Sequence, residues 1–211
     1  RNIVVQYISW ARKIVRGDLG TSIVTNRPVL QSILEKFPAT MLLAFAATII
    51  SLIIAVIAGT IAAANRGTWK DLGLLLLSLL WVSIPSFWLG IMLILVFSIE
   101  FPIFPAIGHV SMFVDFGKSM HHLTLPAITL GATLAGASTR MTRSEMIEQM
   151  SKDYVTTARA KGLSRPVVIY KHALRNSLIT VVTFTGLQLG TLLGGTVVVE
   201  KIFAWPGLGL M

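Results

Sequence analysis

Three histidines and one aspartate lie close together in a polar segment and have the chemistry to bind a metal ion. His109, Asp115, His121 and His122 fall between two uncharged runs of the sequence, and imidazole and carboxylate groups are common zinc ligands. Their spacing lacks the pair of ligands one turn apart on a helix that metallohydrolases use. Surface histidines are therefore the simpler interpretation. We expect no metal site, and a membrane metallohydrolase is a remote alternative.

Two other kinds of reactive site are missing from the sequence. It contains no cysteine, which excludes a disulfide framework, a thiolate metal site and a cysteine nucleophile. It also lacks the phosphate-binding pattern Gly-x-x-x-x-Gly-Lys-Ser/Thr, so the chain should not hold ATP itself. Gly17 and Gly20 form a short glycine pattern without the required lysine, and we interpret them as a turn. We predict no catalytic residue and no cofactor bound by this chain.

The composition indicates an integral membrane protein. Hydrophobic residues make up 54% of the 211 residues and charged residues 13%, with a mean hydropathy of +0.76. Soluble domains have about a quarter charged residues. The net charge of +9 could suggest nucleic acid as a partner. However, these basic residues have few aromatic or polar neighbours and flank apolar runs, so we expect a lipid bilayer and no nucleic acid.

Uncharged runs predict the membrane spans. About 20 apolar residues cross the hydrocarbon core as a helix, and backbone groups in lipid must form hydrogen bonds within the segment, which requires helices. We therefore predict an all-α integral membrane protein, a polytopic helical bundle with four spans in this fragment. The predicted spans are residues 39–64, 72–99, 123–139 and 176–199. Pro85 should kink the second of them.

The density of lysine and arginine predicts which segments share a side of the membrane. Segments 65–71 and 140–175 are about twice as rich in these residues as segments 1–38, 100–122 and 200–211. By the positive-inside rule we place the first group in the cytoplasm. Both ends of the chain then lie outside. Since the chain starts at Arg1 without a methionine, we expect flanking segments to be missing from it.

The outer segment 1–38 should contain two interfacial helices. Residues 3–16 have the pattern of a basic amphipathic helix that Gly17 can cap. A second, short helix would begin with Asn26 as its cap and Pro28 in its first turn. These helices either lie on the bilayer or form a docking platform for an external partner, and the sequence leaves both possibilities open.

The spans themselves favour close helix packing over ion-coupled transport. No ionisable side chain lies inside the four runs, whereas ion-coupled carriers usually need such groups, so a carrier remains a remote alternative. Gln188 should either hydrogen-bond another helix or face a hydrated route. Small residues at four-residue spacing form either packing faces within one subunit or a subunit interface along a pathway. They are Ala47, Ser51, Ala55, Gly59 and Ala63 in the first span, and Gly186, Gly190 and Gly194, with Gly195 adjacent, in the last.

The long charged segment 140–175 carries the strongest functional signal. Met146, Met150, Tyr154 and Ala158 recur every four residues and predict an amphipathic helix that ends at Gly162. Ser164 and Pro166 should start a second helix that continues into the last span. Such a helix–turn–helix could transmit motion from a cytoplasmic partner to the spans. Alternatively, its amphipathic helix could rest on anionic lipid.

The sequence of this segment resembles the EAA loop of ABC importer permeases, and more closely its dipeptide, oligopeptide and nickel branch. The resemblance rests on the run DYVTTARAKGL at residues 153–163 followed by HALRN at residues 172–176. The family's Glu-Ala-Ala becomes Thr156-Thr157-Ala158 here, and its final proline is replaced by Arg175. Further short patterns of the branch occur in the same order at residues 17–22, 27–29, 38–40, 105–108, 122–127, 194–195 and 200–209.

The resemblance implies a transmembrane permease subunit of an ATP-driven importer in the inner or plasma membrane. It would form half of a translocation pathway for di- or oligopeptides, with glutathione or chelated nickel as alternatives. Its partners would be a second, different permease subunit, two ATPase subunits that carry ATP and Mg²⁺, and an extracytoplasmic binding protein. The full chain would have six spans, with residues 39–211 forming a permease domain that lacks its C-terminal span.

The resemblance also assigns residues. Residues 140–175 would be a cytoplasmic coupling loop, with residues 157–162 inserted into a groove on the ATPase. The candidate coupling residues are Asp153, Tyr154, Thr157, Ala158, Arg159, Ala160, Lys161, Gly162, His172, Leu174 and Arg175. The candidate helix-packing or pathway residues are Gly186, Gln188, Gly190, Gly194 and Gly195.

Overall fold

The computed structural model describes residues 3–23 and 26–211, and of residues 193–195 it describes the backbone alone. The described residues form helices, with one isolated antiparallel bridge between Thr21 and Pro28. Of the elements below, η1 and η2 are π-helices and η3 is a 3₁₀ turn. In chain order they are α1 (Ile3–Val15), α2 (Val29–Ala64), α3 (Trp69–Ser83), α4 (Ser86–Ile94), η1 (Leu95–Glu100), α5 (Phe116–Met150), α6 (Asp153–Ala160), η2 (Val167–Ala173), α7 (Leu174–Gly195), α8 (Val197–Ile202) and η3 (Leu208–Leu210).

Helix α1 confirms the predicted amphipathic helix, but the prediction of a short second helix is wrong. Gly17 ends α1 with a positive φ of 79°, as predicted. Asn26 also has a positive φ, of 54°, and Pro28 takes the cap position instead. From Val29 the backbone continues as one helix of 36 residues, about 54 Å long, with Pro38 inside it. The predicted boundary at residue 38 therefore falls within α2.

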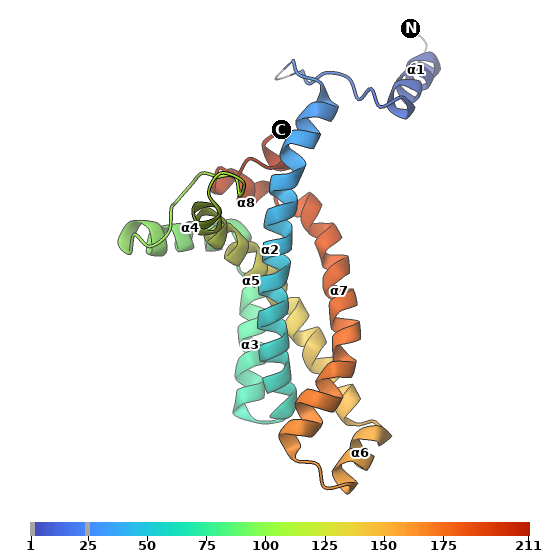
Figure 1. The fold of residues 1–211 in the computed structure, drawn as a ribbon, viewed down its shortest axis with the longest axis vertical. Helices are drawn as coiled ribbons and strands as arrows, with labels where there is room; N and C mark the ends of the chain where they lie inside the picture. Colours follow the sequence, from blue (N-terminus) through green and yellow to red (C-terminus); the bar gives the residue numbers. More distant parts are fainter. Residues whose placement is uncertain (1–2, 24–25) are drawn as a thin grey trace.

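Pro85 breaks the second predicted span much more strongly than a kink. Proline lacks an N–H and disfavours helical geometry in the residue before it, and Ile84 accordingly adopts an extended conformation (φ −77°, ψ 123°). The axes of α3 and of α4 with η1 differ by 97° across this break. Helix α3 runs beside α2, whereas α4 turns away from the bundle (Figure 1). Residues 72–99 are thus not one straight helix.

Length and composition identify fewer spans in the structure than the sequence predicted. Among the described residues, α2 is long and apolar enough to cross a membrane, and the bent pair of α3 with α4–η1 passes as a second only if it is counted as one span. Helix α5 contains many glycine, serine and threonine residues, which lower its hydropathy. The count of four spans stays a prediction.

Helix α5 joins the third predicted span to the start of the predicted loop. Asp115 caps it by accepting a hydrogen bond from the backbone N–H of Lys118 (3.0 Å), and the helix continues past residue 139 to Met150. Lys152 is extended (φ −77°, ψ 153°) and separates it from α6. The sequence predicted a single amphipathic helix that reaches Gly162. The structure has two helices instead, because the helical conformation is interrupted at Ser151 and Lys152.

The predicted second helix of the loop is confirmed. The chain resumes helical structure at Arg165 and passes through η2 directly into α7. The backbone N–H of Val168 donates to the carbonyl of Ser164 (3.1 Å), so Ser164 begins the first turn as expected. Any displacement of η2 along its axis must therefore also displace α7.

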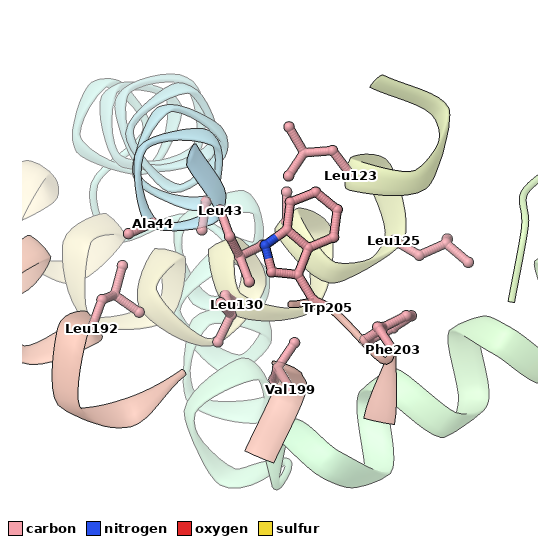
Figure 2. Close-up of a cluster of buried hydrophobic side chains, with 11 residues drawn as sticks. Leu43, Ala44, Leu123, Leu125, Leu130, Leu192, Val199, Phe203 and Trp205 are labelled. Carbon is pink, nitrogen blue, oxygen red and sulfur yellow. The ribbon is translucent and has the colours of Figure 1, made fainter. Parts of the chain in front are cut away.

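A buried apolar cluster joins the N-terminal half of α2 to α5, α7, α8 and the last residues of the chain. The indole of Trp205 lies at its centre, between leucines from α2 and α5 (Figure 2), and its Nε1 donates to the carbonyl of Ala39 (2.8 Å). The cluster consists of Leu43, Ala44, Ala47, Leu123, Leu125, Ala127, Leu130, Leu192, Val199, Phe203 and Trp205.

The connecting segments gather at two opposite ends of the bundle (Figure 1). At one, here called the α6 end, the guanidinium of Arg143 binds Asp71 and that of Arg165 binds the carbonyl of Ala64. At the other, the α8 end, Lys36 donates to the carbonyl of Leu210 (2.7 Å) and the N–H of Gly108 donates to the carbonyl of Phe203 (2.9 Å). This grouping agrees with the one predicted from charge.

Candidate functional site

A tight turn with a glycine at its tip ends helix α6. The backbone N–H of Gly162 donates to the carbonyl of Arg159 (2.9 Å), and that of Leu163 donates to the carbonyl of Ala158 (3.3 Å). Gly162 has a φ of 78°, a conformation that glycine adopts without steric cost. The predicted cap is thus confirmed, and it fixes the direction in which the chain leaves α6.

The inner face of α6 is fixed to its neighbours by burial. Val155 and Ala158 pack against Val168 of η2, and all three side chains are buried. The hydroxyl of Tyr154 donates to the side-chain oxygen of Gln149 in α5 (2.9 Å). Among the predicted coupling residues, Tyr154 and Ala158 therefore position α6 and do not face outward. Because these contacts reach both α5 and η2, α6 cannot shift without displacing them.

The opposite side of α6 and the turn after it form an exposed, positively charged surface. We call this the α6 surface, and it consists of Thr156, Thr157 and residues 159–166, all of which are exposed. Arg159, Lys161 and Arg165 give it three positive charges and it contains no acid. Leu163, 39% exposed, adds an apolar side chain. Such a surface suits a partner with acidic groups around an apolar pocket.

The structure divides the remaining predicted coupling residues among different surroundings. Asp153 is exposed at the first turn of α6. His172 and Leu174 lie at the junction of η2 and α7 and are partly buried, whereas Arg175 is exposed. His172 lies in the last turn of η2, and Leu174 and Arg175 begin α7, so none of these three belongs to the α6 surface.

The small residues of the first span pack within this chain. Ala47, Ser51, Ala55, Gly59 and Ala63 are all buried. A Cβ at Gly59 would lie 2.6 Å from the Cβ of Thr142 in α5, so α2 and α5 approach closely there. Packing within one subunit is the correct interpretation for this face.

The glycines of the last span are on an open face instead. No described atom lies within 4 Å of a Cβ built on Gly186 or Gly190, so the described residues do not pack against these two, and their role stays a prediction. The side-chain oxygen of Gln188 accepts a hydrogen bond from Ser138 of α5 (3.3 Å), as the helix-to-helix interpretation predicted. The surroundings of Gly194 and Gly195 fall outside the described residues.

An ion pair at the α6 end was not predicted from the sequence. Arg143 of α5 donates from Nε and Nη2 to the two carboxylate oxygens of Asp71 (2.6 and 2.7 Å), and Asp71 is 4% exposed. These hydrogen bonds hold the pKa of Asp71 below its ordinary value, although burial opposes them. In the sequence Asp71 borders an apolar run and Arg143 lies in the charged segment 140–175, but which charges pair depends on how the helices pack.

A buried carboxylate at the α8 end was also missed. Glu200 is 0% exposed and accepts hydrogen bonds from the hydroxyls of Thr40 (2.7 Å) and Thr196 (3.1 Å) and from the backbone N–H of Gly209 (2.6 Å). The same Thr40 oxygen accepts the N–H of Leu208 (2.8 Å). A glutamate next to a predicted span gave no sequence signal for burial.

His109 lies in the loop before α5 and His121 and His122 lie near the start of α5, and the three do not gather around a common point. His109 packs edge-on against Trp205, with ring centroids 4.6 Å apart, and His121 packs against Phe104 at 4.9 Å. Burial, and then the neighbouring His122, lower the pKa of His109. Among the described residues no group of three or more His, Asp or Glu side chains could hold a metal ion.

Comparison with known proteins gives the family. Residues 55–211 match the model of the binding-protein-dependent transport system inner membrane component. The chain is 41% identical over 208 residues to the oligopeptide transport system permease protein AppB of Bacillus subtilis (strain 168), which covers 97% of the chain and 66% of that protein. It is 43% identical over 206 residues (98% and 66%) to a putative peptide transport system permease protein of Brucella suis biovar 1 (strain 1330). To the glutathione transport system permease protein GsiC of Escherichia coli (strain K12) it is 42% identical over 204 residues (97% and 64%).

The chain spans about 64–66% of the length of these relatives. The family match covers well over half of the chain and includes α3 to α8, with both the α6 surface and the buried Glu200. The chain therefore belongs to the family of binding-protein-dependent transport system inner membrane components.

Proposed function

We propose that this chain is part of the transmembrane permease subunit of an ATP-driven importer, and that residues 140–175 couple it to ATPase subunits. The observation that carries this proposal is the α6 surface. It is exposed and cationic at the end of the bundle, while the inner face of the same helix is fixed to α5 and η2. A helix held in this way transfers a force applied to its outer side into the bundle.

The family assignment supports the proposed partner proteins. A binding-protein-dependent transport system needs a binding protein on the outer side and an energy source on the inner side. We propose two ATPase subunits that carry ATP and Mg²⁺ and receive residues 157–162 in a groove, with Arg159 and Lys161 meeting acidic or carbonyl groups. A second, different permease chain would complete the pathway, and the open face of α7 at Gly186 and Gly190 is a surface on which it could pack.

Peptides are the proposed substrates. Two of the relatives above are named as oligopeptide or peptide permeases, and the third as a glutathione permease. Glutathione is itself a tripeptide, so the same pathway could carry it. Chelated nickel is the other alternative. A binding assay on the cognate external binding protein with trialanine, glutathione and a nickel chelate would separate the three.

The membrane arrangement of the chain is part of the proposal. We place the α6 end in the cytoplasm and the α8 end outside, with four spans in this chain and six in the full-length subunit. The segment before the first span would be extracytoplasmic, with α1 lying on the bilayer. Helix α1 supports this because all of its residues but Ala11 and Ile14 are largely exposed, and its aromatic residues Tyr7 and Trp10 suit a membrane interface.

Gly162→Trp is the experiment that tests this function. Gly162 lies at the tip of the α6 surface, and no described atom would be within 4 Å of an added Cβ. We expect the variant to insert and assemble but to hydrolyse ATP without uptake, because the indole would obstruct the groove. Uptake of trialanine or glutathione, whichever the wild-type complex carries, and ATP hydrolysis would be measured in the same vesicles.

Two controls separate bulk from backbone strain in this test. Gly162→Asn adds a small side chain whose residue type tolerates positive φ, and this variant should retain most uptake. Gly17→Trp places the same bulk at another open glycine, with a φ of 79°, but in the outer segment, and should leave coupling unchanged. If Gly162→Trp supports ATP-driven uptake as the wild type does, the proposed role of this loop is wrong.

A further inference from the structure

The Asp71–Arg143 pair lies where the turn between α2 and α3 meets α5. Asp71 is in the first turn of α3, and both of its carboxylate oxygens are bound by the guanidinium of Arg143, at 2.6 and 2.7 Å. The backbone N–H of Gly67 donates to the same carboxylate (3.0 Å). A two-point contact of this kind fixes orientation as well as distance. The pair therefore attaches the whole turn to α5.

A second arginine, which follows α6 in the sequence, binds the same turn. Arg165 follows α6 in the chain, and its guanidinium donates to the carbonyl of Ala64, the last residue of α2. Arg143 precedes α6 and Arg165 follows it, so α6 is bracketed by two arginines that bind the two ends of one turn. Both connections reach the hairpin of α2 and α3 at the α6 end.

Apolar packing fills the space between these two connections. Ala63 of α2, Met146 of α5, and Ile169 and Ala173 of η2 form one buried cluster. A Cβ on Gly59, one turn before Ala63 in α2, would lie 2.9 Å from the carbonyl oxygen of Thr139, so α2 and α5 are in close contact there. The hairpin and the loop segments thus form one block at this end.

The covalent chain cannot supply this link. Helix α6 is joined directly to α5 and to η2–α7, which can follow its movement. The chain joins α5 to the hairpin through α4, η1 and the loop before α5, which lie toward the opposite end of the bundle (Figure 1). The hairpin can follow α6 only through contacts between side chains and backbone.

We propose that the Asp71–Arg143 pair is the positioning contact that carries the motion of α6 into the α2–α3 hairpin. This inference rests on the proposed function, because it assumes that an ATPase moves α6. This pair combines two charged groups, a forked geometry and a nearly buried acceptor. It therefore resists being pulled apart or rotated, because two parallel hydrogen bonds fix the guanidinium on the carboxylate.

The test measures uptake per ATP hydrolysed. Complexes carrying Asp71→Asn, Arg143→Gln or both changes would be purified through a tag on the ATPase subunit, so that only assembled complexes reach the vesicles. Trialanine or glutathione uptake and hydrolysis would then be measured together. We expect each single variant to lower the ratio about fivefold or more, as in typical coupling between sites. The double variant should fall no further than the larger single effect. Arg143→Lys keeps the charge without the fork and should lie between.

A matched control comes from an exposed ion pair between α5 and the residue that precedes α6. Glu148 and Lys152 are 3.3 Å apart and exposed, and Glu148→Gln should leave the ratio unchanged. A pair that only holds the fold together would lower the yield of complex and leave the ratio in purified complexes as in the wild type. That result, or effects of the single variants that multiply in the double variant, would overturn the inference. If Gly162→Trp uncouples uptake but these variants do not, the proposed function stands without this link.

Discussion

The carboxylate of Glu200 is enclosed by hydrogen-bond donors from three segments of the chain. They are Thr40 of α2, Thr196 before α8 and the backbone of Gly209. A buried carboxylate is unfavourable unless such donors replace water, and here they connect the last residues of the chain to α2. A Cβ on Gly207 would overlap the carboxylate, which explains the absence of a side chain at that position.

Glu200→Gln should destabilise the α8 end although it changes few atoms. The amide nitrogen would replace one acceptor by a donor that faces the existing donors, so at least one buried group would lose its partner. We expect a loss of about 1–3 kcal/mol in the free energy of unfolding, measured by chemical or thermal unfolding in detergent. Glu148→Gln, at an exposed glutamate, should change it by less than about 0.5 kcal/mol. Equal stabilities of the two variants would show that the Glu200 contacts contribute little.

Helix α2 depends on small side chains for its packing against α5. Gly59 faces Thr142, and Gly131 of α5 faces Ala47 and Ile50 of α2, so each helix provides a glycine where the other approaches. Apolar burial offers little drive for association in lipid, and close backbone contact replaces it. The interface between these two helices is therefore specified by the absence of side-chain volume.

Gly59→Ala should force α2 and α5 apart. The added methyl group would lie 2.6 Å from the Cβ of Thr142, and overpacking of this kind costs about 1–3 kcal/mol. Unfolding of the purified subunit in detergent would measure the loss. Gly186→Ala makes the same change in α7, where no described atom lies within 4 Å. It should be neutral or stabilising, because alanine favours helices more than glycine does. A loss as large at Gly186 would contradict the packing explanation.

Element types were predictable from the sequence, but several boundaries were not. Gly17, Pro85 and Gly162 each end or break a helix where the sequence predicted it, because their effect on the backbone is local. The boundaries at residues 38 and 139 came from changes in hydropathy, which mark where side chains change their solvent. The helical backbone continues through both positions, Pro38 included, since a change in the solvent around side chains does not itself end a helix.

The polar contacts described above lie at the two opposite ends of the bundle. The α6 end holds the α6 surface and the Asp71–Arg143 pair, and the α8 end holds Glu200 and the loop before α5. The proposal that ATPases act on one end and a binding protein on the other requires these ends to face different compartments.

Labelling of introduced cysteines would test this arrangement, since the chain has none of its own. Ala160→Cys lies on the α6 surface, and Phe113→Cys replaces a fully exposed side chain at the other end. A membrane-impermeant maleimide should label the Phe113 variant in intact cells and the Ala160 variant only in inside-out vesicles. Bound ATPase should protect the Ala160 variant. Labelling of the Ala160 variant from outside would reverse the orientation and remove the basis for coupling.

By itself, the sequence determined the helical class, the family, the grouping of segments at two ends and the turn at Gly162. These depend on composition, on short-range backbone preferences and on residue patterns in the chain. Only the tertiary structure decided that Asp71 meets Arg143, that Glu200 is buried against Thr40, and that the small residues of α2 pack inside while Gly186 and Gly190 stay open. Each of these joins or separates residues from different helices, and such contacts depend on how the helices cross in space, which no local pattern records.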